Sequence, residues 1–444
     1  MRFKLLLLAA VLGSLLACLA IVFVYNLPPV HQRLAWRVSG WQAQVRRALN
    51  PPEQLVFVPG GQAEPGAVST MVEATAQAVQ TAAALTPNPA NEATPTFTPA
   101  PSMTVQPSAT PTPLPTPIPA KAVLNGIVHE YQQFNNCGPA NLAMALSYWG
   151  WQGDQRDTRL YLRPKLEVDD KNVMPAEMVA FVEQSAGLKA LTRVGGDIGL
   201  LKQLIAAGFP VVIEAGHHPP KDWWMGHYLV VSAYDDEQGS FWVQDSLLNP
   251  NVPLPYTELS ERWWRDFNYV YLVIYPPERE AEVMNILGDR ATEAYGYQSA
   301  AQRALEEIPA LQGRDQFFAW FNLGSSRVGL GDYAGAAEAF DQAFAIYQQL
   351  SEEQRPYRLM WYQTGPYEAY YAVGRYQDVI NLANTTFFWV GQPVLEESYY
   401  WRGMAYAALG QTNLAIADFE KAAGLNPYYA PPRAELNKLG VTPP

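Results

Sequence analysis

The chain has 444 residues and two cysteines, and these two differ in what they could do chemically. Cys18 lies inside a run without charged residues, 5–25. Cys137 is therefore the single thiol outside that run, and it has no partner for an internal disulfide. An unpaired thiol in an exported chain is a liability unless it reacts, although free cysteine also packs as a small buried hydrophobe.

Cys137 stands where the sequence predicts the start of a helix over 136–149. Pro139 suits the first turn, because proline lacks an N–H that would be unpaired there. The apolar residues that follow give this helix a buried face. The free N–H groups and the dipole at a helix N-terminus favour the thiolate, which is the nucleophilic form of cysteine.

A cysteine nucleophile needs a base, and His227 is the best placed of the five histidines. It opens a predicted strand, 227–234, which could hold the imidazole in register with the helix end. Asp245 ends the returning strand of the same hairpin, where its carboxylate could fix the imidazole tautomer. Taken alone, either residue is more often structural. The adjacent pair His217 and His218 lacks a spaced third ligand, so no metal site is expected.

Three separated stretches resemble a single family. QQFNNCGPANLAMALSYWGW, GFPVVIEAG and GHYLVVSAYDDEQGSFWVQD are similar to papain-like cysteine peptidases of the bacteriocin-processing, double-glycine-leader type, in particular their stand-alone peptidase C39-like branch. The resemblance covers about residues 123–277. It implies Cys137 as nucleophile, His227 as general base and acid, and Asp245 as the orienting carboxylate.

The same resemblance implies a glutamine just before the nucleophile that donates from its side-chain amide to the oxyanion. Gln132 is the preferred candidate and Gln133 the reserve. Relatives usually carry proline after the acid, whereas this chain has Ser246. The exporters of this type also carry a transporter and an ATP-binding cassette, but this chain has no phosphate-loop motif.

The sequence predicts elements that would position these residues. A buried strand is expected at 210–214, a short helix at 200–207, and a further strand at 269–275. The region after residue 277 has almost no strand signal and instead resembles tetratricopeptide repeats, with a weak copy over 284–304 and a degenerate one around 361–376. Two better copies carry matching residues: Trp320, Leu323, Gly324, Ala336, Phe340 and Ala343 in one, and Tyr399, Gly403, Ala415, Phe419 and Ala422 in the other.

The N-terminal part predicts a membrane tether. Residues 1–26 are expected to form a transmembrane signal anchor, since the charge-free run would span roughly 31 Å as a helix. Cleavage of this segment, or lipidation at Cys18, stays open. Residues 27–60 are expected to form a juxtamembrane stem. Residues 61–121 are expected to form a disordered Pro/Thr-rich linker, a polyproline-type stalk with a reach on the order of 100 Å.

These observations predict an α+β papain-like cysteine peptidase domain (122–277) and an all-α tetratricopeptide-repeat solenoid (278–444). We expect a single-pass cell-membrane protein with its globular part extracytoplasmic, which hydrolyses peptide bonds through a Cys-His-Asp triad. The repeats would bind substrate or a protein partner. The alternative is a catalytically silent peptide-binding scaffold, and acyl transfer to an amine also stays open. No cofactor is expected, and a net charge of −12 argues against a nucleic-acid partner.

Overall fold

The computed structural model describes residues 13, 20, 22–25, 27, 30, 56–60, 118–133, 135–165, 172–218, 224–388 and 394–444. The expected anchor, stem and linker fall largely outside these residues and stay predictions. Among the described residues, no helix is long and apolar enough to span a bilayer.

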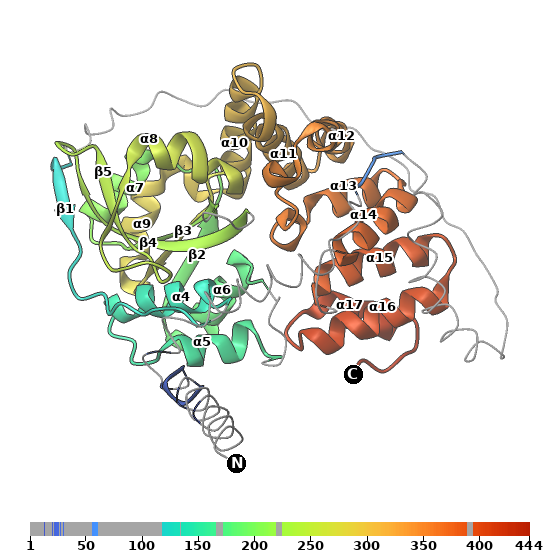
Figure 1. The fold of residues 1–444 in the computed structure, drawn as a ribbon, viewed down its shortest axis with the longest axis horizontal. Coiled ribbons are helices and arrows are strands. Elements are labelled where there is room, and N and C mark those ends of the chain that lie inside the picture. The colour runs from blue at the N-terminus through green and yellow to red at the C-terminus, as the bar shows by residue number, and fades with distance from the viewer. Residues whose placement is uncertain are drawn as a thin grey trace, which may run out of the picture. The chain divides into compact units, whose positions relative to one another are not determined.

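A seven-stranded antiparallel sheet forms the centre of the domain that follows residue 120 (Figure 1). The strand order is β2-β7-β3-β4-β5-β6, and β1 pairs with the part of β4 that extends beyond β3. The strands predicted at 210–214, 227–234, 240–245 and 269–275 are confirmed as β3, β4, β5 and β7. The bounds are β1 Lys121–Val123, β2 Lys189–Arg193, β3 Val211–His217, β4 Met225–Asp235, β5 Ser240–Gln244, β6 Val252–Pro255 and β7 Tyr271–Tyr275.

Both faces of this sheet are buried, because apolar side chains occupy successive positions and alternate between the faces. Val212 and Val230 pack against the helices on one face, whereas Val211 and Val231 pack against the helices on the other. The first face is covered by α4 (Cys137–Tyr148), α5 (Gln155–Leu162) and α6 (Pro175–Phe181), and the second by α7 (Ile198–Ala206) and α9 (Glu280–Leu287). The helices predicted at 136–149 and 200–207 are therefore confirmed as α4 and α7.

The helix α9 differs from the sequence-based expectation. Its last residues, 284–287, were expected to begin a weak repeat over 284–304, but Leu287 is buried in the core of the sheet domain and Met284 packs against that core. Their burial beside α7 means that this segment packs with the sheet domain. The repeat pattern failed here because an amphipathic helix shows the same spacing of apolar residues against any apolar surface.

The C-terminal region is entirely helical and forms antiparallel helix pairs (Figure 1). A Cβ atom at Gly324 would lie 2.7 Å from the ring of Phe340, and one at Gly403 would lie 2.7 Å from Phe419. Small and large residues therefore interlock as the repeat pattern predicts. The bounds are α10 Glu293–Glu307, α11 Gly313–Gly329, α12 Tyr333–Gln349, α13 Gly365–Ala372, α14 Tyr376–Phe388, α15 Glu396–Ala408, α16 Thr412–Leu425 and α17 Ala430–Lys438.

The sheet domain and the repeats share one aromatic cluster. Trp224, just before β4, is fully buried and lies 5.7 Å from Phe267 and 5.4 Å from Phe318 of α11 between ring centroids. Asn322 of α11 donates to the main-chain carbonyl of Arg265 at 2.8 Å. The two regions, expected as separate domains, therefore lie in one compact unit.

Candidate active site

Cys137 is the first residue of α4, at the N-terminus of that helix. Asn136, at the N-cap position, makes no capping bond through its side chain. Its amide instead donates to Gln155 Oε1 at 2.8 Å. The backbone N–H groups of Gly138 and Tyr228 lower the pKa of the Cys137 thiol. The half-buried thiol is thus surrounded by donors that favour its anionic form.

The structure brings His227 to both Asp245 and Cys137. Its Nε2 is 2.9 Å from Asp245 Oδ1, and its ring interacts electrostatically with the Cys137 sulfur. Burial lowers the pKa of His227, but the charges and hydrogen bonds of Asp245 and Cys137 outweigh it and raise that pKa to about 10. Burial also raises the pKa of the Cys137 thiol, but the imidazolium and the backbone donors bring it below its ordinary value. The arrangement favours a thiolate–imidazolium pair at neutral pH.

Asp245 is held in one orientation by its own loop. Its Oδ1 accepts the backbone N–H groups of Leu247 at 2.8 Å and Leu248 at 3.1 Å, in addition to the bond from His227. Burial raises the pKa of Asp245, but His227 and these two donors outweigh burial and bring that pKa below its ordinary value. The carboxylate therefore stays ionised and requires the His227 nitrogen that faces it to carry the proton.

Gln132 is linked to the loop of the acid through Ser246. The Ser246 hydroxyl donates to Gln132 Oε1 at 2.8 Å and accepts from Asn141 Nδ2 at 2.9 Å. Asn141 also donates to the carbonyl of Cys137, one helical turn earlier. With Oε1 engaged, the amide nitrogen is the end of Gln132 that can donate to a substrate. Ser246, the departure from the expected proline, is thus the residue that orients the predicted oxyanion donor.

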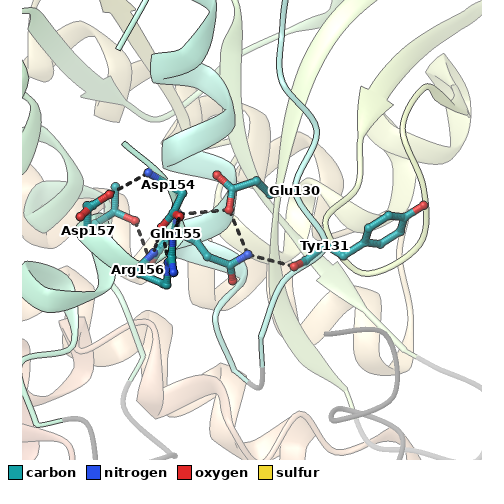
Figure 2. A network of polar contacts seen from close by, with 7 residues as sticks. Glu130, Tyr131, Asp154, Gln155, Arg156 and Asp157 are labelled. Carbon is teal, nitrogen blue, oxygen red and sulfur yellow. Dashed lines mark hydrogen bonds and ion pairs between the residues drawn. The ribbon is translucent and has the colours of Figure 1, made fainter. Parts of the chain in front are cut away.

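Gln133 has a different surrounding, which includes Gln155; Figure 2 shows Gln155 with its partners Glu130 and Tyr131. The Gln133 backbone N–H donates to Oε1 of the buried Gln155 at 2.8 Å. Gln155 Nε2 donates to Glu130 at 3.0 Å and to the carbonyl of Tyr131 at 2.9 Å. The side chain of Gln155 makes four hydrogen bonds, to Gln133, Asn136, Glu130 and Tyr131. These bonds hold the segment that precedes the nucleophile. Gln133 contributes its main chain to this arrangement.

Glu214 of β3 is a buried acid beside the nucleophile that the sequence analysis did not identify. Burial raises its pKa well above the ordinary value, and the nearby Cys137 sulfur raises it further. A neutral Glu214 can donate to the Tyr228 hydroxyl, which in turn donates to the carbonyl of Val173 at 2.8 Å. The neutral form adds no second negative charge next to the thiolate, so it leaves the His227 imidazolium paired with Cys137 and Asp245.

Tyr362, from the segment between α12 and α13, brings the repeat region to the same place. Its ring lies beside Gly226 and edge-on to Phe267, with 5.5 Å between the two ring centroids. A Cβ atom at Gly226 would lie 2.6 Å from Phe267 and 2.9 Å from Tyr362, so only glycine fits directly before His227. The chain after the sheet domain therefore contributes to the wall beside the base.

Residues 125–271 match the Peptidase_C39 like family, and residues 319–350 and 396–429 match the tetratricopeptide repeat. The chain carries a Peptidase_C39-like domain followed by tetratricopeptide repeats. A solved structure from Bacillus anthracis, described as a C39-like peptidase, is 19% identical and covers 35% of this chain and 96% of its own, with a TM-score of 0.29. A search of curated proteins finds no match.

The matched C39-like segment contains every site residue predicted from sequence, and it ends before Tyr362. Asn141 could have been found from sequence, because it lies four residues after Cys137 and therefore on the same helix face. Ser246 was visible only as a departure from the family pattern. Gln155 and Tyr362 carry no local signal, since their role depends on contacts with distant segments.

Proposed function

We propose that this protein is a cysteine peptidase that hydrolyses peptide bonds, with its repeat region binding substrate or a protein partner. The observation that carries this proposal is the hydrogen bond between Asp245 and His227, with His227 interacting electrostatically with Cys137 at a helix N-terminus. The resemblance to the C39-like family supports the same reaction class. Cys137 is the free cysteine among the described residues.

The reaction follows from the charges at the site. The Cys137 thiolate attacks the carbonyl carbon of the peptide and forms a C–S bond, while the carbonyl electron pair moves onto oxygen. Gln132 donates from Nε2 to this oxyanion. The His227 imidazolium transfers its proton to the amine nitrogen as the C–N bond breaks, which leaves a thioester.

The second half of the cycle uses the neutral imidazole. His227 accepts a proton from water while the water oxygen attacks the thioester carbon. The C–S bond breaks, the acid product leaves, and the thiolate–imidazolium pair of Cys137 and His227 forms again. Asp245 keeps the same His227 nitrogen protonated throughout, so that the other nitrogen can exchange the proton.

We further propose that the enzyme acts outside the cell, held at the membrane by the apolar run at 5–25. The support is the charge-free length of that run and the Pro/Thr-rich composition that follows it. A membrane-impermeant, thiol-directed peptidase probe should then label Cys137 on intact cells. Labelling that requires cell lysis would contradict this location.

A peptide library provides the test of the reaction. The full-length chain and its Cys137→Ala variant are incubated with the library in heavy-oxygen water, and products are read by mass spectrometry. Hydrolysis predicts heavy oxygen in new carboxyl termini, with kcat/KM lower by about 10⁴-fold or more for the variant. Products joined to an added amine would instead indicate acyl transfer. Identical product sets from both chains would exclude a Cys137 peptidase and favour the silent scaffold.

The base is tested with the same peptidase probe. His227→Ala should lose most of its labelling at neutral pH, because the thiol then lacks the imidazolium that lowers its pKa. His218→Ala is the matched control, since this exposed histidine lies at the end of β3. Equal labelling of wild type and His227→Ala would exclude activation of Cys137 by this base.

A further inference from the structure

A short piece of the expected stem, residues 56–60, lies against the repeats. Phe57 is 5% exposed, although it lies far from the repeats in sequence. Its ring lies edge-on to Phe344 of α12 at 4.9 Å and tilted to Tyr370 of α13 at 6.0 Å. Val58, the next residue, is 46% exposed. One side chain of an extended segment thus enters the repeat surface while its neighbour points away, as in peptides bound by a groove.

A polar contact fixes the other end of this segment. The Gly60 N–H donates to Asp378 Oδ1 of α14 at 2.9 Å. Gly60 has a φ of +67°, a backbone conformation that favours glycine, and it follows Pro59 in a turn. The requirement for an aromatic ring, a turn and a glycine N–H makes this contact selective for sequences of the form Phe-x-Pro-Gly.

The acceptor for this N–H is oriented by the repeats themselves. Asp378 Oδ2 accepts from Arg375 Nε at 2.7 Å, and Arg375 also pairs with Asp341 at 2.7 Å. The Tyr370 hydroxyl donates to Asp341 at 2.9 Å. The carboxylate that receives Gly60 is therefore held by a network of repeat residues, and the same network positions the ring that contacts Phe57.

The contact is small, so its occupancy depends on the covalent link. It consists of one buried aromatic ring and one hydrogen bond, while Val58 remains exposed. The other end of the intervening chain is also held on the same compact unit, where Lys121 of β1 pairs with Asp235 of β4. A link of about 60 residues raises the local concentration of a segment to the order of millimolar, enough to keep a weak site filled.

We propose that α12, α13 and α14 form a binding site for a Phe-x-Pro-Gly peptide, and that residues 56–60 are its resident ligand. The bound segment blocks the site against other peptides. Release of the segment would open the site to other peptides. This proposal concerns the repeats and does not depend on peptide hydrolysis.

The test measures binding of a fluorescent peptide with the sequence of residues 52–64, by anisotropy. All chains are full length and carry Cys137→Ala, so that cleavage cannot affect the result. The chain that also carries Phe57→Ala should bind the peptide at least about tenfold more tightly than the chain with Phe57, because the resident competitor is weakened. Val58→Ala is the matched control and should behave like the chain with Val58, since this side chain is exposed.

A second chain leaves the contact itself unchanged. A protease recognition sequence is inserted near residue 101, and cutting there removes the covalent link without altering Phe57 or the repeats. The cut chain should also bind the labelled peptide at least about tenfold more tightly than the uncut one. This comparison tests the proposal even if Phe57→Ala fails to fold. Equal binding before and after cutting, or no binding by either form, would overturn the proposal.

Discussion

Two regions of the chain meet at Gly226 and His227, and they are held in place by different forces. On one side, Cys137 and Gln132 are positioned by hydrogen bonds from Asn141 and Ser246. On the other side, Tyr362 belongs to a cluster of rings with Trp224 and Phe267. The first region is polar and lies within the C39-like domain, whereas the second is aromatic and crosses to the repeats.

The difference follows from what each force can specify. Hydrogen bonds depend on distance and angle, so a network of them fixes which atom of Gln132 faces a substrate. Aromatic burial depends mainly on area and contributes stability with a looser dependence on geometry. We therefore expect substitutions in the polar region to change the reaction rate and to leave the free energy of unfolding almost unchanged. Substitutions in the aromatic region should change the free energy of unfolding and leave the reaction rate almost unchanged.

The largest effect is expected from the oxyanion donor. Gln132→Ala should lower kcat by about 10²-fold or more, because it removes a donor that acts on the charge of the transition state. Gln133→Ala is the matched control and should stay close to wild type, since Gln133 contributes its backbone N–H. The measurement is kcat on a peptide identified from the library, with melting temperatures recorded for both. A larger loss for Gln133→Ala would reverse the assignment.

An effect on rate of at most the same size, with a distinct pH signature, is expected for Asp245→Asn. The active pair exists above the lowered pKa of Cys137 and below the raised pKa of His227, about 10. Removing the carboxylate charge should lower the pKa of His227, so the alkaline limb of kcat/KM moves to lower pH. The rate should fall by about 10²-fold.

Asp235→Asn is the control for that substitution. Asp235 ends β4 and pairs with Lys121, away from the imidazole. Its pH profile should match that of wild type. An alkaline limb that stays in place for Asp245→Asn would show that another group sets the pKa of the base.

The smallest effect concerns stability and tests the aromatic region. Asp266 accepts a hydrogen bond from Trp224 Nε1 at 2.7 Å, and burial raises its pKa from 3.8 to about 7. The folded state then binds a proton that the unfolded state releases, so the free energy of unfolding falls as pH rises from about 4 to 7. The slope is up to about 1.4 kcal/mol per pH unit.

Asp266→Asn keeps an oxygen that can accept from Trp224 and removes the titration. Urea unfolding of wild type and variant at several pH values should therefore show a difference that changes across this range, with kcat unchanged. If the difference in free energy of unfolding between wild type and variant did not change with pH, Asp266 would have the same pKa in the folded and unfolded states. If Asp266→Asn lowered kcat without changing the free energy of unfolding, the proposed difference between the two regions would be wrong.

The sequence alone determined the elements whose cause is local. A proline and an apolar face predict α4, with Cys137 at its N-terminus. Short continuous apolar runs predict β3 and β7, and the spacing of Gly324 and Phe340 predicts two helices in close contact. The order of Cys137, His227 and Asp245 was also readable, because a family pattern records contacts that a single chain does not reveal.

Only the tertiary structure decided which distant residues complete these elements. It links Gln132 to Ser246 and Gln155 to the segment before the nucleophile, and it brings Tyr362 to Gly226 and Phe57 to the repeats. Patterns of polarity and spacing record which face of an element is buried, and they contain no information on its partner across long separations in the chain. Partners are selected when all segments pack at once, because hydrogen-bond geometry and ring contacts must be satisfied together.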